Sequence, residues 1–219
     1  MLADGASTQR IMLDVLIGLL PITLAALWYF RGAAVIQIVV CLVVAGATEW
    51  GLQRLRGKPN SLGDLSVWIT ALILAYSLPP RLPLYGTILG TFVAVALGKM
   101  AFGGLGYNLF NPAMVGRAFL MVCFPVEMTQ WVEPLTVHAT TQATPLAAAK
   151  FSGQFTELGP LLMGNISGSL GETSALMVLL GGLWLLYRNA ADWRLALGML
   201  LGVSGVAALD QLIRGSGAG

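Results

Sequence analysis

The residues best suited to chemistry lie in three polar stretches of a chain that is otherwise strongly apolar. The first is 138–150, HATTQATPLAAAK, in which Thr144 stands directly before Pro145. A residue before proline is pushed toward extended backbone, so the Thr144 hydroxyl is displayed and suited to modification or attachment. Hydrolysis at Thr144 would need an adjacent base, and the single histidine, His138, is six residues away. A polar surface loop without chemistry is the alternative.

The second stretch is 103–119, GGLGYNLFNPAMVGRAF. It lacks the Lys-Ser/Thr of a phosphate-binding P-loop and follows an apolar helix, not a strand, which excludes nucleotide hydrolysis. Asn111 is placed to cap a helix that begins at Pro112. A helix N-terminus at membrane depth favours an anion or the polar edge of a ring. The alternative is a compact turn that binds nothing.

The third stretch is 164–187, GNISGSLGETSALMVLLGGLWLLY. Its first three glycines permit sharp bends of the backbone, and the pattern predicts a helix beginning near Glu172, with Glu172 in the first turn. The nearby hydroxyls would form a second polar wall of a cofactor pocket, or only a capped helix start. Gly181 and Gly182 predict close helix packing.

Two acids fall inside apolar segments. A carboxylate at membrane depth is costly and is a functional candidate by default, so Glu49 is a candidate for an ion path. Asp14 lies about one turn from a helix end, where snorkelling to the interface competes with function. Cys41 and Cys123 form no metal-binding pattern. We expect both to be small buried hydrophobes, and no zinc or iron–sulfur site within this chain.

The elements that must position these residues are membrane helices. Hydrophobic residues make up 57% of the 219 and charged residues only 10%, against about 25% in soluble domains. The net charge of +2 gives no argument for nucleic acid. We expect an all-α integral membrane fold of about seven transmembrane helices, since a span needs about 20 apolar residues. The candidates are 11–30, 33–52, 65–79, 83–101, 113–125, 174–187 and 194–210.

Two of these candidates, 65–79 and 113–125, are short and bounded by proline and glycine. They are either broken helices that line a site or ordinary short helices. With the N-terminus in the cytoplasm, eight Lys and Arg residues fall inside and four outside, which fits the positive-inside rule. This orientation counts Lys99 with the inner loop and turns the threonine stretch outward. We expect one transmembrane domain, 1–219, in which 126–173 is the outward-facing region.

The order FGGLGYNLFNPAMVGRAFLMVCFPVEMTQW, TTQATPL and GNISGSLGETSAL resembles the RnfD/NqrB family, and SLGDLSVWITALILAYSLPPRLP resembles its upstream segment. This family comprises membrane subunits of Rnf and sodium-translocating NADH:quinone reductase complexes. The NPAMVG motif favours RnfD. The family carries FMN joined through its phosphate to the last threonine of a Ser/Thr-Gly-Ala-Thr motif. The resemblance places that threonine at Thr144, with Gln142 where the family has glycine.

The resemblance implies an electron-transfer subunit of an Rnf-type ferredoxin:NAD oxidoreductase in the bacterial inner membrane. Electron flow would be coupled to Na⁺ or H⁺ transport, and the fold would resemble the urea-transporter scaffold. It also implies partner subunits with flavin or iron–sulfur centres, a flavin transferase, and room for a second flavin. The residues expected to bind flavin are Thr144, Asn111, Arg117, Glu172, Thr173 and Ser174.

The chain also departs from the family, because it is short at its C-terminal side and lacks a DPVTSP-like segment. Two other readings therefore stand beside electron transfer. One is a transporter or channel on the same scaffold without redox chemistry. The other is an inactive, truncated subunit.

Overall fold

The computed structural model describes residues 8–132, 134, 144–153, 156–172 and 174–216, and the regular structure within these ranges is helical. The principal helices are α1 (Thr8–Phe30), α2 (Gly32–Leu55), α3 (Ser66–Ser77), α4 (Leu84–Val93), α5 (Pro112–Cys123), α9 (Ala175–Tyr187) and α10 (Trp193–Ser216). Helix α4 continues without a break into a π-helical turn, η2 (Ala94–Met100). The shorter connecting elements are η1 (Leu62–Asp64), α6 (Pro125–Met128), α7 (Pro145–Ser152) and α8 (Leu158–Met163).

Each of the seven segments predicted from hydropathy overlaps one of the principal helices. Three stretches are long and apolar enough to cross a membrane, namely α1, α2 and residues Trp193–Asp210 of α10. The remaining four are shorter apolar helices. The all-α membrane character is therefore confirmed, whereas seven crossings and the urea-transporter-like scaffold stay predictions.

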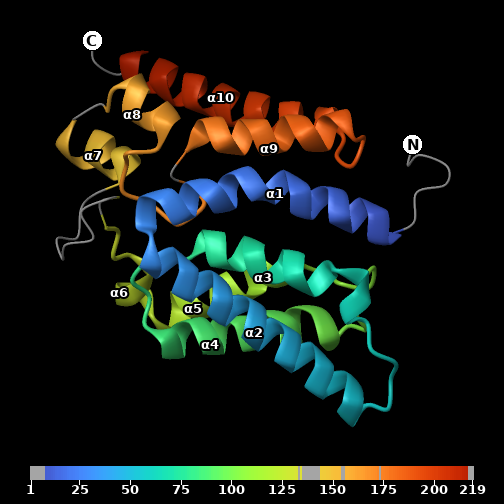
Figure 1. Ribbon diagram of the computed structural model, residues 1–219. Helices are drawn as coiled ribbons and strands as arrows, with labels where there is room; N and C mark the ends of the chain where they lie inside the picture. Colours follow the sequence, from blue (N-terminus) through green and yellow to red (C-terminus); the bar gives the residue numbers. More distant parts are fainter. Residues whose placement is uncertain (1–7, 133, 135–143, 154–155, 173, 217–219) are drawn as a thin grey trace.

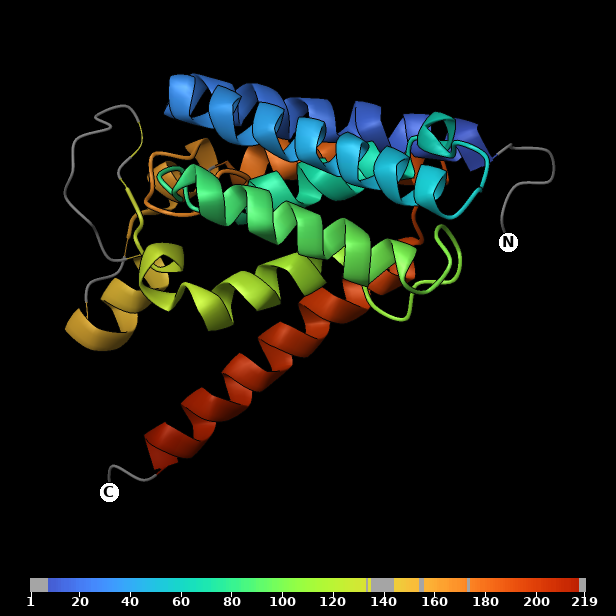
Figure 2. The same ribbon diagram turned by 90° about the horizontal axis from the view of Figure 1, so that it is seen from below.

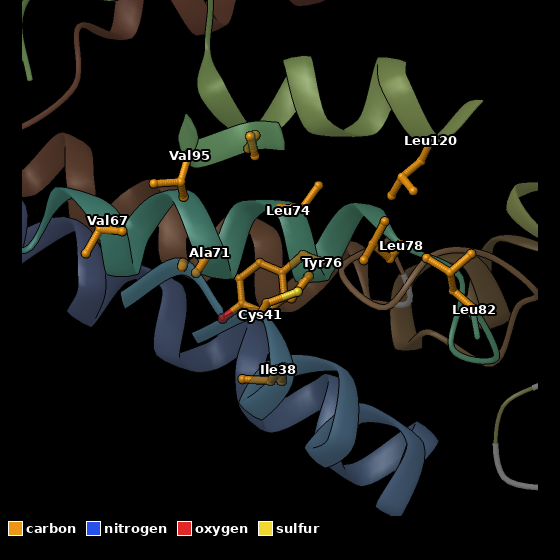
Figure 3. Packing of buried hydrophobic residues seen from close by; sticks show 14 of the residues in the cluster. Ile38, Cys41, Val67, Ala71, Leu74, Tyr76, Leu78, Leu82, Val95 and Leu120 are labelled. Carbon is orange, nitrogen blue, oxygen red and sulfur yellow. The ribbon is translucent and has the colours of Figure 1, made fainter. Parts of the chain in front are cut away.

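The hydrophobic core is built around α3. Val67, Ala71 and Leu74 of α3 are almost fully buried, and Figure 3 shows them between Cys41 of α2 and Val95 of η2. Helices α4 and α5 approach closely because of their glycines. A Cβ added at Gly116 would lie 2.6 Å from the Gly90 carbonyl oxygen, so this contact admits no side chain.

Helix α1 joins this core to α9, and Figure 1 shows it between α9 and α3. Gly181 of α9 packs directly against the backbone of Gly18 in α1, which confirms the close packing predicted for Gly181. Gly182 meets nothing within 4 Å, so the same prediction was wrong for that residue. Gly182 is one helical position further round and points away from α1.

The interface between α1 and α9 also holds an ion pair. Arg188 donates from Nε to Asp14 Oδ1 over 3.1 Å and from Nη2 to Asp14 Oδ2 over 3.2 Å. Asp14 is therefore a buried partner of Arg188, not a snorkelling side chain. Helix α10 contrasts with α9, because residues 193–210 are exposed throughout. Figure 2 shows α10, in red, diverging from the other helices.

Candidate functional site

The glycine stretch before α5 forms a tight turn, as predicted, in which Gly103 and Gly106 are exposed and Gly104 is buried. Gly103, Gly104 and Gly106 have φ values of 116°, 101° and 88°, a region that residues with a Cβ rarely adopt. The turn delivers the chain to Asn111, whose Oδ1 accepts a hydrogen bond from the Ala113 backbone N–H over 3.0 Å. Pro112 follows as the first helical residue. The predicted cap is therefore confirmed.

A pocket of about 390 Å³ lies beside this cap, within the usual size range of small-molecule sites. We call it the Lys99 pocket, after the single charged side chain among its lining residues. Those residues are Met12, Ser66, Ile69, Thr70, Ile73, Lys99, Leu105, Asn108, Leu109, Phe110, Asn111 and Pro112. The lining thus combines apolar walls with two amides, two hydroxyls and one ammonium group.

Lys99 forms a buried ion pair with Glu49. Lys99 Nζ lies 2.6 Å from Glu49 Oε2 and donates to Ser66 Oγ over 2.7 Å. Glu49 is 0% exposed and Lys99 only 1%. A buried charge is costly unless it is paired and hydrogen-bonded, and both conditions are met here.

The remaining oxygen atoms of this cluster are also satisfied. Glu49 Oε1 accepts from Ser61 Oγ over 2.5 Å and from Gln53 Nε2 over 3.3 Å. Ser66 Oγ donates to Asp64 Oδ1 over 2.6 Å, which leaves its lone pairs to face Lys99. The ammonium of Lys99, on η2, is thus fixed at the edge of the pocket by side chains of α2 and α3.

The position of Lys99 corrects its assignment to the inner loop. Glu49 and Lys99 are separated by 50 residues, as are the bonded pairs Gln37–Thr87 and Cys41–Thr91. A constant separation means that α2 and the α4–η2 helix run parallel and in register. Steps of four residues drift round an α-helix of 3.6 residues per turn. The wider π turn of η2 offsets that drift, so Lys99 returns to the face that meets Glu49.

Thr144 lies in a second candidate site, which we call the Thr144 cap and define as Thr144 with α7. Thr144 has extended backbone, φ −65° and ψ 155°, as expected before proline, and it caps α7. Its Oγ1 accepts from the Ala147 backbone N–H over 3.3 Å. The side chain is half-buried, and α7 contains no buried residue. His138 and Gln142 lie outside the described residues.

The third polar stretch begins its helix later than predicted. Ser174 caps α9, which begins at Ala175 and not near Glu172, and Ser174 Oγ accepts from the Met177 N–H over 3.4 Å. Glu172 is exposed and two residues before the cap, so its predicted place in the first turn was wrong. The Gly171 N–H is held instead by the Tyr76 carbonyl over 2.8 Å. Thr173 lies outside the described residues.

The candidate flavin-binding residues are divided between the two ends of α3. Ser66 and Thr70, in its first half, line the Lys99 pocket with Asn111, whereas Tyr76, near its last residue, holds Gly171. The 12 residues of α3 span roughly 18 Å. Glu172 and Ser174 therefore belong to the other end. Figure 2 shows the same division, with gold α7 far from the green turn 101–111.

Arg117 and the two cysteines differ in how far they are buried. Arg117 is half-buried on α5 but is not among the residues that line the Lys99 pocket. Cys41 is buried, as expected, whereas Cys123 is exposed near the end of α5, so the expectation of burial was wrong for Cys123. Cys123 is the last residue of α5 and lies beyond the buried positions Ala113, Gly116 and Leu120 of that helix. No group of three or more potential metal ligands occurs among the described residues.

The fold and these two sites define a helical membrane protein with polar sites set among apolar helices. Residues 1–216 match the model of the NQR2, RnfD, RnfE family, and the chain belongs to that family.

Relatives named as subunits of ion-translocating complexes are similar to this chain over most of its length. The D subunit of a proton-translocating ferredoxin:NAD(+) oxidoreductase complex from Clostridium ljungdahlii is 36% identical, over 91% of the chain and 64% of the relative. The D subunit of a Na(+)-translocating ferredoxin:NAD(+) oxidoreductase complex from Acetobacterium woodii is 39% identical, over 86% and 61%. The chain thus spans less than two thirds of the length of these two relatives.

Proposed function

We propose that this chain is a membrane electron-transfer subunit of an ion-translocating, Rnf-type oxidoreductase complex and carries FMN covalently on Thr144. The observation that carries the proposal is the Thr144 cap: a threonine with extended backbone, directly before proline, at the N-terminus of a helix. Similarity to the D subunits of two ferredoxin:NAD(+) oxidoreductase complexes supports the same role.

The Thr144 cap suits a phosphate ester. The N-terminal N–H groups of a helix and its dipole favour an anion at this position. A phosphate on Thr144 Oγ1 would lie beside the Ala147 N–H that the hydroxyl already binds. When bound, FMN supplies one-electron and two-electron transfer. The residues of the cap would hold its phosphate at the end of the molecule that we place on the outer side.

The Lys99 pocket supports a second, non-covalent flavin. A flavin has an apolar ring body and a polar edge of alternating donors and acceptors, and the pocket offers both kinds of surface. The Asn111 side-chain oxygen caps α5, and its amide nitrogen, which has no partner among the described residues, is a donor for the ring edge.

The proposal also includes coupling of electron flow to ion movement. Glu49 is a fully buried acid on α2, and it is paired with Lys99. The relatives are named for different ions, one proton-translocating and the other Na(+)-translocating, and we propose Na⁺ or H⁺ for this chain. Its partners would be the other subunits of the complex, in a bacterial inner membrane, with a flavin transferase for maturation.

The covalent flavin is tested by flavin fluorescence in a denaturing gel after co-expression with a flavin transferase. Thr144→Ala should abolish the fluorescent band, and Thr141→Ala, a threonine of the same stretch, should keep it. A band that survives Thr144→Ala would overturn the assignment. No band in the unaltered chain, with a known flavinylated protein as positive control, would favour a transporter or an inactive subunit.

A further inference from the structure

We propose that Lys99 stabilises the negative charge that a flavin in the Lys99 pocket gains on reduction, and that Glu49 limits how strongly Lys99 does so. This inference rests on the proposed second flavin and assigns its electrostatic control to this chain's own residues. It does not involve Thr144.

The burial of Lys99 is the first observation that supports an electrostatic role. An ammonium group that is 1% exposed acts on nearby charges with little screening from water or salt. Lys99 is the single charged residue in the pocket lining, and the carboxylates of its partner Glu49 and of Asp64, which binds Ser66, offset part of its field. One added electron places one negative charge near one fixed positive charge.

The hydrogen bonds of Lys99 are the second ground. Glu49 Oε2 and Ser66 Oγ hold Nζ at 2.6 and 2.7 Å, so the charge is preorganised and does not have to move when the carrier is reduced. Leu65, which precedes Ser66, has a φ of 64°. Such backbone strain in a non-glycine residue persists only where the surroundings enforce it.

Glu49 supplies the opposing charge. Its carboxylate cancels part of the field of Lys99 in the pocket, so the pair sets an intermediate potential. Removing the charge of Lys99 should therefore lower the midpoint potential of a bound flavin, and removing the charge of Glu49 should raise it. A purely structural role would shift both variants in the same direction, or would change only the amount of flavin bound.

The flavin is favoured over a quinone by the polar lining. Ser66 Oγ and Thr70 Oγ1 donate their hydrogens within the protein and keep lone pairs as acceptors, whereas the Asn111 amide nitrogen is a donor. The lining thus offers acceptors as well as a donor, whereas the carbonyl oxygens of a quinone can only accept. The polar edge of a flavin presents both donors and acceptors, so it can pair with the oxygen and with the nitrogen of a side-chain amide. Riboflavin, which has no phosphate, is the appropriate probe because it cannot be esterified at Thr144 through FMN.

The experiment is a spectroelectrochemical titration of riboflavin bound to the purified, detergent-solubilised full chain in a Thr144→Ala background. Dithionite supplies the electrons, the flavin takes them up, and no bond to the protein forms or breaks. Lys99→Gln should lower the equilibrium constant for one-electron reduction by about tenfold, equivalent to about 59 mV. Glu49→Gln should raise it, and Lys99→Arg, which keeps the charge, should restore the unaltered value.

A failure of the control by Lys99 can be distinguished from a failure of the proposed second flavin. Arg188→Gln, at the ion pair with Asp14, is the matched control and should leave the potential unchanged. If both variants still bind riboflavin but Lys99→Gln and Glu49→Gln shift its potential in the same direction, or do not shift it, the electrostatic role of Lys99 is wrong. The proposed second flavin would still stand. If the unaltered pocket binds a soluble ubiquinone analogue but no riboflavin, both the second flavin and its control by Lys99 are wrong.

Discussion

The Lys99 pocket and the Thr144 cap are both polar sites in an apolar molecule, but different forces hold them in place. Lys99 is fixed by a buried ion pair and hydrogen bonds that join α2, α3 and η2. Thr144 depends on one local hydrogen bond at the start of a helix without buried residues. Substitutions in the pocket should therefore change the stability of the fold, whereas substitutions at the cap should change chemistry alone.

The largest effect on stability is expected for Lys99→Met. It leaves Glu49 as an uncompensated buried charge, which typically costs about 3–5 kcal/mol. The thermal midpoint of the purified protein in detergent should fall accordingly. The double variant Lys99→Met with Glu49→Gln should recover much of that loss, because no buried charge then remains. Equal losses in the single and double variants would show that packing, not the charge, holds this site.

Asn111→Ala is expected to have the next largest effect. It removes the side-chain acceptor for the Ala113 N–H, and loss of an N-cap costs about 1 kcal/mol. Asn111→Asp keeps an acceptor oxygen and should keep the thermal midpoint. If riboflavin binding falls in both variants, the amide nitrogen of Asn111 binds the ligand. Unchanged binding in both would remove Asn111 from the pocket's ligand contacts.

Arg188→Gln should change the stability less. The Arg188 side chain is 31% exposed and that of Asp14 is 11% exposed. Ion pairs that water and salt can screen contribute about 0–1 kcal/mol. Chemical denaturation in detergent should therefore show a small loss that shrinks further at high salt. A loss as large as that of Lys99→Met would contradict the difference drawn between the two pairs.

Thr144→Ala should have the smallest effect on global stability. Because α7 contains no buried residue, losing its cap frays that helix locally and leaves the packed helices intact. We expect a change below about 0.5 kcal/mol in the free energy of unfolding. The thermal midpoint and the yield from membranes report this, with Thr129→Ala as the matched control. A large fall in either would mean that Thr144 has a structural role.

The sequence predicted local features well because their causes are local. The cap at Asn111, the first-position Pro112 and the extended backbone at Thr144 each follow from the type of the residue and its neighbours. Glu49 was also found, because an acid in an apolar segment is conspicuous. The beginning of α9 was misplaced because Ser174 competes with several earlier residues that are also good caps.

The partners of the buried charges could not be predicted in the same way. Glu49 and Lys99 are 50 residues apart, and Asp14 and Arg188 are 174 apart. Pairing at these separations depends on helix packing and on the π turn of η2, which carries no simple sequence signal. One available signal was the repeated separation of 50 residues between polar positions in 33–52 and 83–101. The Lys99 pocket required the same tertiary information.

The most direct measurement is mass spectrometry of peptides from the chain co-expressed with a flavin transferase. We expect the peptide containing residues 138–150 to carry the mass of FMN, less one water, and fragmentation to assign this mass to Thr144. A peptide that is unmodified, while a known flavinylated protein from the same cells is modified, would contradict the account. So would FMN assigned to Thr140 or Thr141.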